Sequence, residues 1–375
     1  MANKEHSILY FMGTWAVGGV ERVTAELANE WIRRGWRVSI FAFTMENDLL
    51  RKDLSDQVTF VVPNAGVMTD ASAAALRQVI VEQKVAYVVN DWCLPFKTTR
   101  FLRRVCKGLD VRQIACLHNV PNHNARIAGA RNPLVRALYR VASQANMFLA
   151  YLFCDRYVVL SESFKPIFRR FACVPFARRL DAVGNPLTIP CDAAPQEEKE
   201  NILLYVGRLE EKQKKFSRVV AMWKDELSDA LPDWRLEVVG DGPDRAAYEA
   251  SLAGVPRVVF HGFQNPAPFY AKAKILVMTS DFEGFGLVLV EAMSAGCVPV
   301  VLDSFAAVHD IIDGTNGNGV LVPAPFDERR FASSVAALMR DAPRLASLSA
   351  AARKTSRNFS VASIVDKWET LLAGL

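Results

Sequence analysis

Short apolar runs alternate with amphipathic helical patterns along the whole chain. Most of these runs are five or six residues long and rich in Val, Ile, Leu and Phe, which is typical of strands buried on both faces. Their alternation with helices predicts an α/β fold with parallel sheets and crossover helices. The predicted strands span residues 7–12, 38–43, 58–62, 85–90, 113–117 and 157–161, and then 201–206, 234–239, 257–261, 275–279, 298–302 and 319–322.

The chain is long enough for two domains, because one hydrophobic core rarely serves 375 residues. Between the two sets of strands lies a polar stretch with several prolines, which is typical of a linker. We therefore predict a first domain at residues 1–184, a linker at 185–200 and a second domain at 201–359. The last segment, 360–375, has the periodicity of an amphipathic helix.

The composition is that of an ordinary globular protein, with 51% apolar and 23% charged residues. The seven cysteines include no C-x-x-C pair, which favours reduced cysteines in a cytosolic protein. No apolar run approaches the roughly 20 residues that a membrane-spanning helix needs. We therefore expect a cytoplasmic protein without a spanning segment.

The most informative motif is a pair of glutamates, Glu283 and Glu291, placed eight positions apart around a predicted helix start. Glu283 stands in a polar loop after a strand, and Glu291 lies within the helical pattern. Gly284 and Gly286 allow the backbone between strand and helix to turn tightly. This local geometry predicts a loop that exposes backbone groups at the end of a strand.

The start of this helix is a candidate phosphate site. The N–H groups of Phe285, Gly286 and Leu287 would point out of it, and the positive end of the helix dipole favours anions. Glu291 lies deeper along the helix, where it can accept hydrogen bonds from the vicinal hydroxyls of a ribose. A nucleoside diphosphate satisfies both features. The alternative is an ordinary β-loop-α unit in which both glutamates face solvent.

Two motifs of the second half resemble those of a known family. The sequence EGFG at 283–286, followed by Glu291, resembles the E-x7-E signature of the retaining GT-B glycosyltransferases of family 4. Residues 205–209 and 214–218 are similar to the G-R-L and K-G-F-D-R-L elements of that family. The resemblance covers nearly the whole chain and is strongest from 200 to 325.

The resemblance implies the GT-B architecture, in which two Rossmann-like domains face each other and a C-terminal helix crosses back to the first domain. It also implies transfer of a hexosyl unit from a nucleotide sugar, expected to be a UDP-sugar, to a glycan or lipid-linked acceptor in cell-surface polysaccharide or lipopolysaccharide synthesis. Such enzymes retain the anomeric configuration. They use no metal and no cofactor beyond the nucleotide sugar.

The resemblance also implies roles for particular residues. Arg208 and Lys214 are expected to stabilise the leaving diphosphate, and Glu283 is expected to contact the sugar hydroxyls. Phe263 belongs to the loop whose backbone receives the nucleotide base in the family. Lys215 stands where the family usually has glycine, which leaves the identity of the key lysine open. A solvated run of charges is the alternative interpretation of this loop.

The first half carries two further matches to the family. Gly18 and Gly19 resemble its G-G-x-E-R loop and permit positive φ and a close approach to the donor phosphates. His118 follows the strand at 113–117, matches the family's H-N motif and is expected to contact the transferred sugar or the acceptor. The alternatives are a glycine turn without a ligand and a hydrogen-bonded structural histidine. No metal-ligand spacing links His118 to another histidine.

The segment 97–140 is strongly basic, with ten Lys or Arg residues against one acid, Asp110. Its net charge of nine exceeds the +5 of the whole chain. A basic face beside apolar residues such as Leu138 and Val141 would make the segment suitable for an anionic membrane surface on the inner face of the cell membrane, or for a lipid-diphosphate acceptor. A solvated helix face is the alternative. Nucleic acid is disfavoured, because no recognised module accompanies the charge.

Two other classes of function remain open at this point. A sugar-nucleotide epimerase-like enzyme would bind the same donor and convert it without an acceptor. A noncatalytic nucleotide-sugar or glycan-binding protein of the same fold would only bind it. The presence of Arg208, Lys214, Glu283 and Glu291 argues against loss of activity, but the donor sugar, the acceptor and the linkage are not specified by these motifs.

Overall fold

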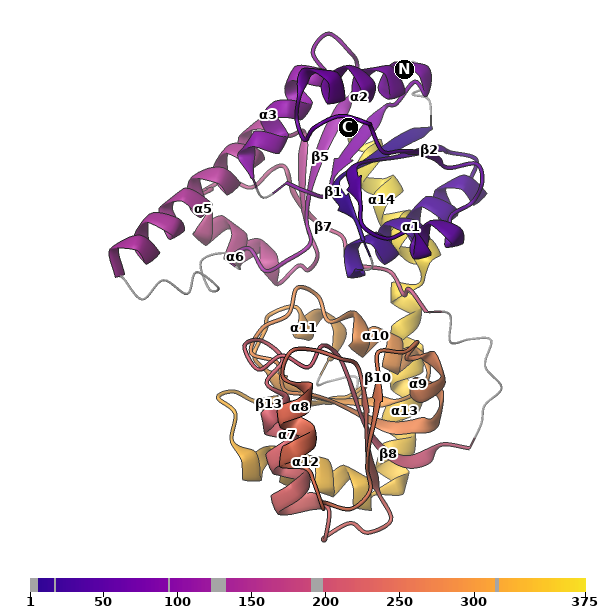
Figure 1. Ribbon diagram of the computed structural model, residues 1–375, viewed down its shortest axis with the longest axis vertical. Coiled ribbons are helices and arrows are strands. Elements are labelled where there is room, and N and C mark those ends of the chain that lie inside the picture. The colour runs from indigo at the N-terminus through magenta and orange to yellow at the C-terminus, as the bar shows by residue number, and fades with distance from the viewer. Residues whose placement is uncertain (1–5, 17, 94, 123–132, 190–197, 314–316) are drawn as a thin grey trace. The chain divides into compact units, whose positions relative to one another are not determined.

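The computed structural model describes residues 6–16, 18–93, 95–122, 133–189, 198–313 and 317–375. The chain forms two compact units, one of Met1–Thr188 together with Val361–Leu375 and one of Ile189–Ser360 (Figure 1). Each unit contains its own sheet, and all strand pairs in both sheets are parallel. The predicted α/β class with two parallel sheets is confirmed.

The first unit has a seven-stranded sheet in the order β3-β2-β1-β4-β5-β6-β7. This is a doubly wound order, which places helices on both faces of the sheet and ligand sites at the carboxyl ends of its strands. The strands are β1 (Ser7–Trp15), β2 (Arg37–Met45), β3 (Thr59–Val61), β4 (Tyr87–Asn90), β5 (Arg112–Leu117), β6 (Arg156–Val159) and β7 (Leu180–Ala182). The helices are α1 (Gly19–Arg33), the 3-10 helix η1 (Leu49–Asp53), α2 (Asp70–Glu82), α3 (Phe96–Val105), α5 (Pro133–Phe153), α6 (Phe164–Phe171) and α14 (Val361–Ala373).

Burial on both faces explains the sequence of the central strands. Residues 7–12 of β1 are all buried, and β1 pairs with β2 on one side and β4 on the other. The helix α1 buries Val23, Leu27 and Trp31, which recur every four residues and so lie on one face.

The second unit has a six-stranded sheet in the order β10-β9-β8-β11-β12-β13. Aspartates cap two of its helices: Asp327 accepts from the N–H of Arg330 at 2.8 Å, and Asp341 from that of Arg344 at 3.0 Å. The strands are β8 (Glu200–Val206), β9 (Arg235–Val239), β10 (Val258–Gly262), β11 (Ala273–Met278), β12 (Val298–Asp303) and β13 (Val320–Pro323). The helices are α7 (Phe216–Met222), the π-helix η2 (Trp223–Leu227), α8 (Arg245–Ser251), α9 (Ala267–Lys272), α10 (Leu287–Ser294), α11 (Val308–Ile311), α12 (Glu328–Arg340), α13 (Ala342–Ser356) and the 3-10 helix η3 (Arg357–Phe359).

The C-terminal helix α14 belongs to the first unit, as predicted. Arg34, at the end of α1, binds Asp366 at 2.7 Å and Glu369 at 2.9 Å. The guanidinium of Arg34 also donates to the carbonyl of Ala362 at 3.0 Å. These contacts attach the last helix to residues more than three hundred positions earlier in the chain.

Some details differ from the sequence-based expectations. Strand β7 was not predicted, and β3 is shorter than the predicted strand at 58–62. The boundaries between the two compact units fall at 188/189 and 360/361, whereas the predicted first domain ends at 184 and the predicted second domain at 359. Part of the predicted linker, 190–197, and two of the predicted basic residues, Arg126 and Arg131, lie outside the described residues.

Candidate functional site

The loop between β11 and α10 turns at Gly286, whose φ of 95° is left-handed and suits glycine. Gly286 is the N-cap residue of α10, and its carbonyl accepts from the N–H of Leu289 at 2.9 Å. Among the residues that the structure describes, none accepts a hydrogen bond from the N–H groups of Phe285, Gly286 or Leu287. The helix therefore begins where the sequence predicted, with amide donors at its start. Their contact with a phosphate stays a prediction.

Glu283, in the loop between β11 and α10, forms an ion pair with Lys214. Its Oε1 lies 2.7 Å from the Lys214 Nζ, and the two side chains are only 8% and 19% exposed. A buried carboxylate without a partner would be costly, so the lysine compensates for it. The pair places one cation and one anion, two of the predicted catalytic residues, next to the start of α10.

Backbone contacts between two loops hold this pair in place. The N–H of Asp281 donates to the carbonyl of Gln213 at 2.9 Å, and the Gln213 side chain donates to the carbonyl of Phe282 at 3.0 Å. Gln213 directly precedes Lys214 and Phe282 directly precedes Glu283, so these bonds join the loop after β8 to the loop after β11 beside the ion pair.

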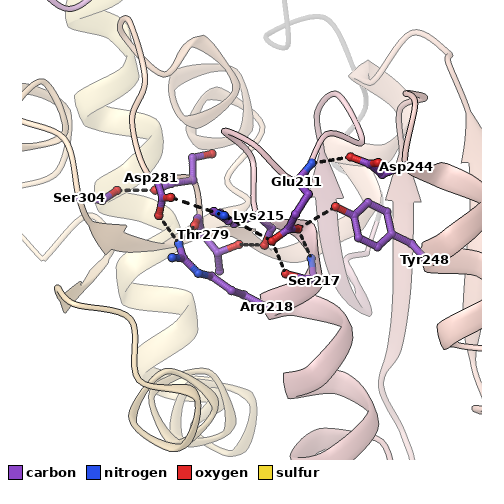
Figure 2. A network of polar contacts seen from close by, with 10 residues as sticks. Glu211, Lys215, Ser217, Arg218, Asp244, Tyr248, Thr279, Asp281 and Ser304 are labelled. Carbon is purple, nitrogen blue, oxygen red and sulfur yellow. Dashed lines mark hydrogen bonds and ion pairs between the residues drawn. The ribbon is translucent and has the colours of Figure 1, made fainter. Parts of the chain in front are cut away.

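Figure 2 shows a polar network that includes Lys215, the residue after Lys214, and Asp281, two positions before Glu283. Arg218, on α7, binds Asp281 at 2.7 Å and donates to the carbonyl of Thr279 at 2.7 Å. The Thr279 hydroxyl donates to the carbonyl of Lys215 at 3.1 Å. Glu211 accepts from the hydroxyls of Ser217 at 2.9 Å and of Tyr248 at 2.8 Å. The loop that carries Lys214 is therefore held by the contacts of Glu211 before this lysine and of Lys215 after it.

The conformation of Lys215 explains why glycine is usual at this position in the resembled family. Its φ is +52° and its ψ is 45°, which is the left-handed region. A lysine pays a steric cost there that glycine avoids. The ammonium of Lys215 lies 3.5 Å from Glu211 and 4.0 Å from Asp281. It is Lys214 whose ammonium binds Glu283.

Glu291 is 4% exposed and lies in the second turn of α10. Its Oε2 accepts a hydrogen bond from the hydroxyl of Tyr270 on α9 at 3.1 Å. The alternative in which both glutamates face solvent is wrong, because Glu283 and Glu291 are both buried. Tyr270 was missed by the sequence interpretation. Its contact with Glu291 spans 21 positions and two helices, and no local pattern signals it.

Three other predicted donor residues lie outside these contacts. The Arg208 side chain is 67% exposed, and its Nε lies 3.8 Å from Glu210. No hydrogen bond within the described part of the second unit joins Arg208 to Lys214 or Glu283. Phe263 is 75% exposed, whereas the Phe285 ring is buried against Phe359 at a centroid distance of 5.9 Å. Phe285 can therefore serve a ligand only through its backbone.

In the first unit, His118 binds Asp91 at the carboxyl edge of the sheet. Its Nε2 lies 2.8 Å from the Asp91 Oδ1, and the two residues directly follow the adjacent strands β5 and β4. Burial lowers the pKa of His118, but Cys116 and the carboxylate of Asp91 outweigh it and raise that pKa well above its ordinary value. We attribute the net rise to Asp91, because burial raises the pKa of the Cys116 thiol and keeps it neutral.

Asp91 was missed by the sequence interpretation, although a signal existed. An acid that directly follows a buried parallel strand lies at the edge where such sheets hold ligands. Thr24, on α1, donates to its second oxygen at 3.4 Å. His118 and Asp91 together are a charged, largely buried pair and not a lone histidine.

The first unit also brings together three groups that are candidate metal ligands. One ligand atom from each of Asp91, Cys116 and His118 lies within 4.8 Å of the other two. The sequence spacing gave no sign of this cluster, because only the order of the strands brings the three residues together. Its chemistry fits a metal poorly, because the His118 Nε2 and the Asp91 Oδ1 already bind each other and burial disfavours the Cys116 thiolate that a metal would need.

The glycine loop after β1 differs from its expectation. Gly18 is extended, with φ −144° and ψ 177°, and Gly19 begins α1. Neither glycine has positive φ. A Cβ on Gly18 would collide with the carboxylate of Glu21, which folds back over the loop. The pKa of Glu21 is raised above its ordinary value. Burial causes the rise, while bonds from backbone N–H groups and the charge of His118 oppose it. Glu21 is therefore an electrostatic neighbour of His118 and not a plain helix-surface residue.

Comparisons with known proteins agree with this geometry. Residues 17–187 match the family described as Glycosyltransferase Family 4, and residues 200–341 match Glycosyl transferases group 1. A galactosyltransferase of Salmonella typhimurium, named lipopolysaccharide 1,6-galactosyltransferase, is 33% identical over 40% of this chain and 44% of its own length. The match thus spans less than half of that relative.

Two further relatives extend over the whole chain. The Campylobacter jejuni GalNAc-alpha-(1->4)-GalNAc-alpha-(1->3)-diNAcBac-PP-undecaprenol alpha-1,4-N-acetyl-D-galactosaminyltransferase is 25% identical, over 98% of both chains. The crystal structure of Anabaena Alr3699/HepE in complex with UDP and glucose has a TM-score of 0.76 at 17% identity, over 99% of this chain and 100% of the other. The fold is therefore GT-B. With both units matched, the chain belongs to the group 1 glycosyltransferases of family 4, a retaining family.

Proposed function

We propose that this protein transfers a hexosyl unit from a UDP-sugar to a glycan or lipid-linked acceptor, with retention of configuration, in the synthesis of lipopolysaccharide or another surface polysaccharide. The observation that carries the proposal is the buried ion pair of Lys214 and Glu283 beside the amide donors at the start of α10. The names of the Salmonella and Campylobacter relatives support a lipopolysaccharide or lipid-linked acceptor. The UDP complex of the Anabaena protein supports the donor base.

The donor's diphosphate would bind the N–H groups of Phe285, Gly286 and Leu287 together with the Lys214 ammonium. As the bond to the sugar breaks, negative charge accumulates on the leaving phosphate, and fixed donors stabilise it without reorganisation. Lys214 is anchored by Glu283, so it is already oriented before the donor arrives. Glu291 would bind the ribose.

Glu283 would accept hydrogen bonds from hydroxyls of the transferred sugar through the carboxylate oxygen that Lys214 does not hold. The departing phosphate would take the proton of the acceptor hydroxyl on the same face of the sugar, which gives retention without a protein nucleophile. His118, kept cationic by Asp91, would bind an oxygen of the sugar or the acceptor. The basic segment 97–140 would bring the protein to the inner, anionic face of the membrane.

The proposal is tested by incubating the protein, in EDTA, with a panel of UDP- and GDP-sugars and measuring the slow release of the nucleoside diphosphate. We expect release from one UDP-hexose to persist in EDTA. We expect Lys214→Ala to lower kcat/KM by about 30- to 1000-fold, or roughly 2–4 kcal/mol, because its charge acts mainly in the transition state. Arg208→Ala should also lower kcat/KM. The control is Lys212→Ala, in the same loop and exposed, which should leave turnover unchanged.

Several results would contradict the proposal. Near-normal turnover in both Lys214→Ala and Arg208→Ala would remove these cations from the site. Loss of activity in EDTA that manganese or magnesium restores would contradict the metal-free reaction. Conversion of the sugar nucleotide without release of the diphosphate would indicate an epimerase. Binding without any conversion, with acceptor glycans present, would indicate a noncatalytic protein.

A further inference from the structure

The first half of α5 carries large apolar side chains that are exposed to solvent. Every residue from Val135 to Ala142 is exposed, and the side chains of Leu138 and Val141 are 62% and 61% exposed. In Figure 1, this part of α5 extends beyond the sheet of the first unit. Soluble proteins rarely expose contiguous apolar surface without a partner, and a short helix gains little stability in water by itself. We therefore expect a binding partner to cover this apolar face.

The apolar face continues along the whole helix. Its members recur three and four positions apart and are exposed: Leu138, Val141, Ala145, Phe148 and Leu152. The opposite face of α5 is buried in the first unit through Met147, Ala150 and Tyr151. The exposed Val135 and Tyr139 widen the face beyond the narrow seam of a coiled coil. A broad apolar face with one side anchored is typical of a helix that lies in a membrane interface.

The helix α3 supplies positive charge beside this face. α3 and α5 pack together through the rings of Phe96 and Phe153, whose centroids are 5.5 Å apart. Arg103 donates to the carbonyl of Phe153 at 3.1 Å and lies over its ring. Neither helix contains an acidic residue. Their exposed cations are Lys97, Arg100, Arg103, Arg104, Arg136 and Arg140.

The positive charge and the apolar character of this surface indicate which partner can cover it. A second copy of the chain would bring two basic surfaces together, which is unfavourable. No helix among the described residues is long and apolar enough to cross a bilayer. An anionic bilayer surface matches both features, since it offers an apolar region below a layer of phosphates.

We propose that α3 and α5 form a membrane-docking surface, in which the exposed apolar residues of α5 enter the headgroup region of an anionic phospholipid bilayer and the cations of α3 bind its phosphates. This deepens the membrane association within the proposed function by naming the elements that carry it. Because vesicle binding needs neither donor nor acceptor, its failure is distinguishable from a failure of sugar transfer.

The apolar part is tested by sedimenting the full chain with vesicles of phosphatidylglycerol and phosphatidylethanolamine, and with vesicles of phosphatidylcholine alone. We expect the wild type to prefer the anionic vesicles at low salt. Leu138→Ser with Val141→Ser should weaken binding by about tenfold or more, because two large apolar side chains no longer leave water. The matched control is Leu49→Ser with Val81→Ser, two exposed apolar residues on η1 and α2, which should bind as the wild type does.

The basic part is tested by Lys97→Glu with Arg100→Glu. Each cation near an anionic surface contributes about a fivefold gain in partitioning, so the double reversal should cost tenfold or more, and the loss should shrink at high salt. The control is Lys52→Glu with Lys367→Glu, which makes the same change in charge at exposed positions outside α3 and α5. Donor hydrolysis in solution should be normal in all four variants, which shows that they are folded.

Three results would overturn the proposal. The first is a wild type that ignores anionic vesicles at low salt or binds phosphatidylcholine equally well. The second is vesicle binding that the α3 and α5 variants leave unchanged. The third is a wild type that sediments as a dimer without lipid and becomes monomeric in Leu138→Ser with Val141→Ser, which would make this face a contact between two copies of the chain.

Discussion

At the scale of single residues, the pair of His118 and Asp91 carries a testable charge. The carboxylate of Asp91 raises the pKa of His118 against the opposing effect of burial. The histidine should therefore titrate in the folded protein above its ordinary value near 6.5. The stability that this charge contributes is complete below that ordinary value, and it is lost as the pH rises through the folded pKa.

Asp91→Asn should lower the pKa of His118, because the amide keeps the shape of the carboxylate and removes its charge. The measurement is an NMR titration of the imidazole, assigned with His118→Gln. Asp110→Asn, at an exposed acid of the same unit, is the control and should leave the titration unchanged. A histidine that titrates at or below about 6.5 in the wild type would show that burial outweighs Asp91.

Lys215 provides a test of backbone strain next to the candidate donor site. Its left-handed conformation suits glycine, whereas a Cβ is strained there. Lys215→Gly should therefore be more stable than Lys215→Ala by about 1 kcal/mol, although both remove the same ammonium. At Lys212, which does not have positive φ, the order should reverse, with alanine the more stable. Urea unfolding of the four variants measures both differences, and equal stability at position 215 would refute the strain.

At the scale of elements, the contacts of Glu211 join the loop after β8 to the helices α7 and α8. Burial raises the pKa of Glu211, but the bonds from Ser217 and Tyr248 and the charge of Lys215 outweigh it, so the folded pKa is lowered. A lowered pKa gives stability that is present above the unfolded value near 4.3 and is lost as the pH falls through the folded value.

Glu211→Gln should therefore be less stable than the wild type at neutral pH, and the difference should shrink as the pH falls below about 4. Denaturant unfolding at several pH values provides the measurement. Glu226→Gln, an exposed residue of η2 outside this network, is the matched control and should show no such convergence. A constant difference between wild type and Glu211→Gln across the range would mean that hydrogen bonding alone, without the charge, stabilises this contact.

The sequence predicted elements better than it predicted contacts between them. The apolar runs located most strands because buried parallel strands are continuously apolar. β7 has three residues, too few for any periodicity, and only its pairing with β6 defines it. The pair of Lys214 and Glu283 spans 69 positions, and that of His118 and Asp91 spans 27, so both depend on strand order. The motifs named three of these four residues, but only the fold shows that each is paired.

At the scale of the whole molecule, the last fifteen residues complete the unit that the first residues begin. α14 buries Ile364, Val365, Trp368 and Leu372, and Trp368 lines a small cavity together with Tyr10 and Leu27. The first unit therefore needs α14 to complete its hydrophobic core. The second unit, Ile189–Ser360, is one continuous segment. A change in α14 should act on residues far away in sequence and leave the nearer second unit alone.

Trp368→Ala should lower the free energy of unfolding of the first unit by about 3–5 kcal/mol, since it removes a large side chain that is 4% exposed. Hydrogen exchange measures the effect in each unit: the amides of β1 and β4 should lose protection, while those of β8 and β11 should keep it. Lys367→Ala, at the adjacent exposed position, should change neither unit. Equal loss of protection in both sheets would mean that the two units unfold together, and unchanged protection in β1 would mean that α14 is not needed to complete the first unit.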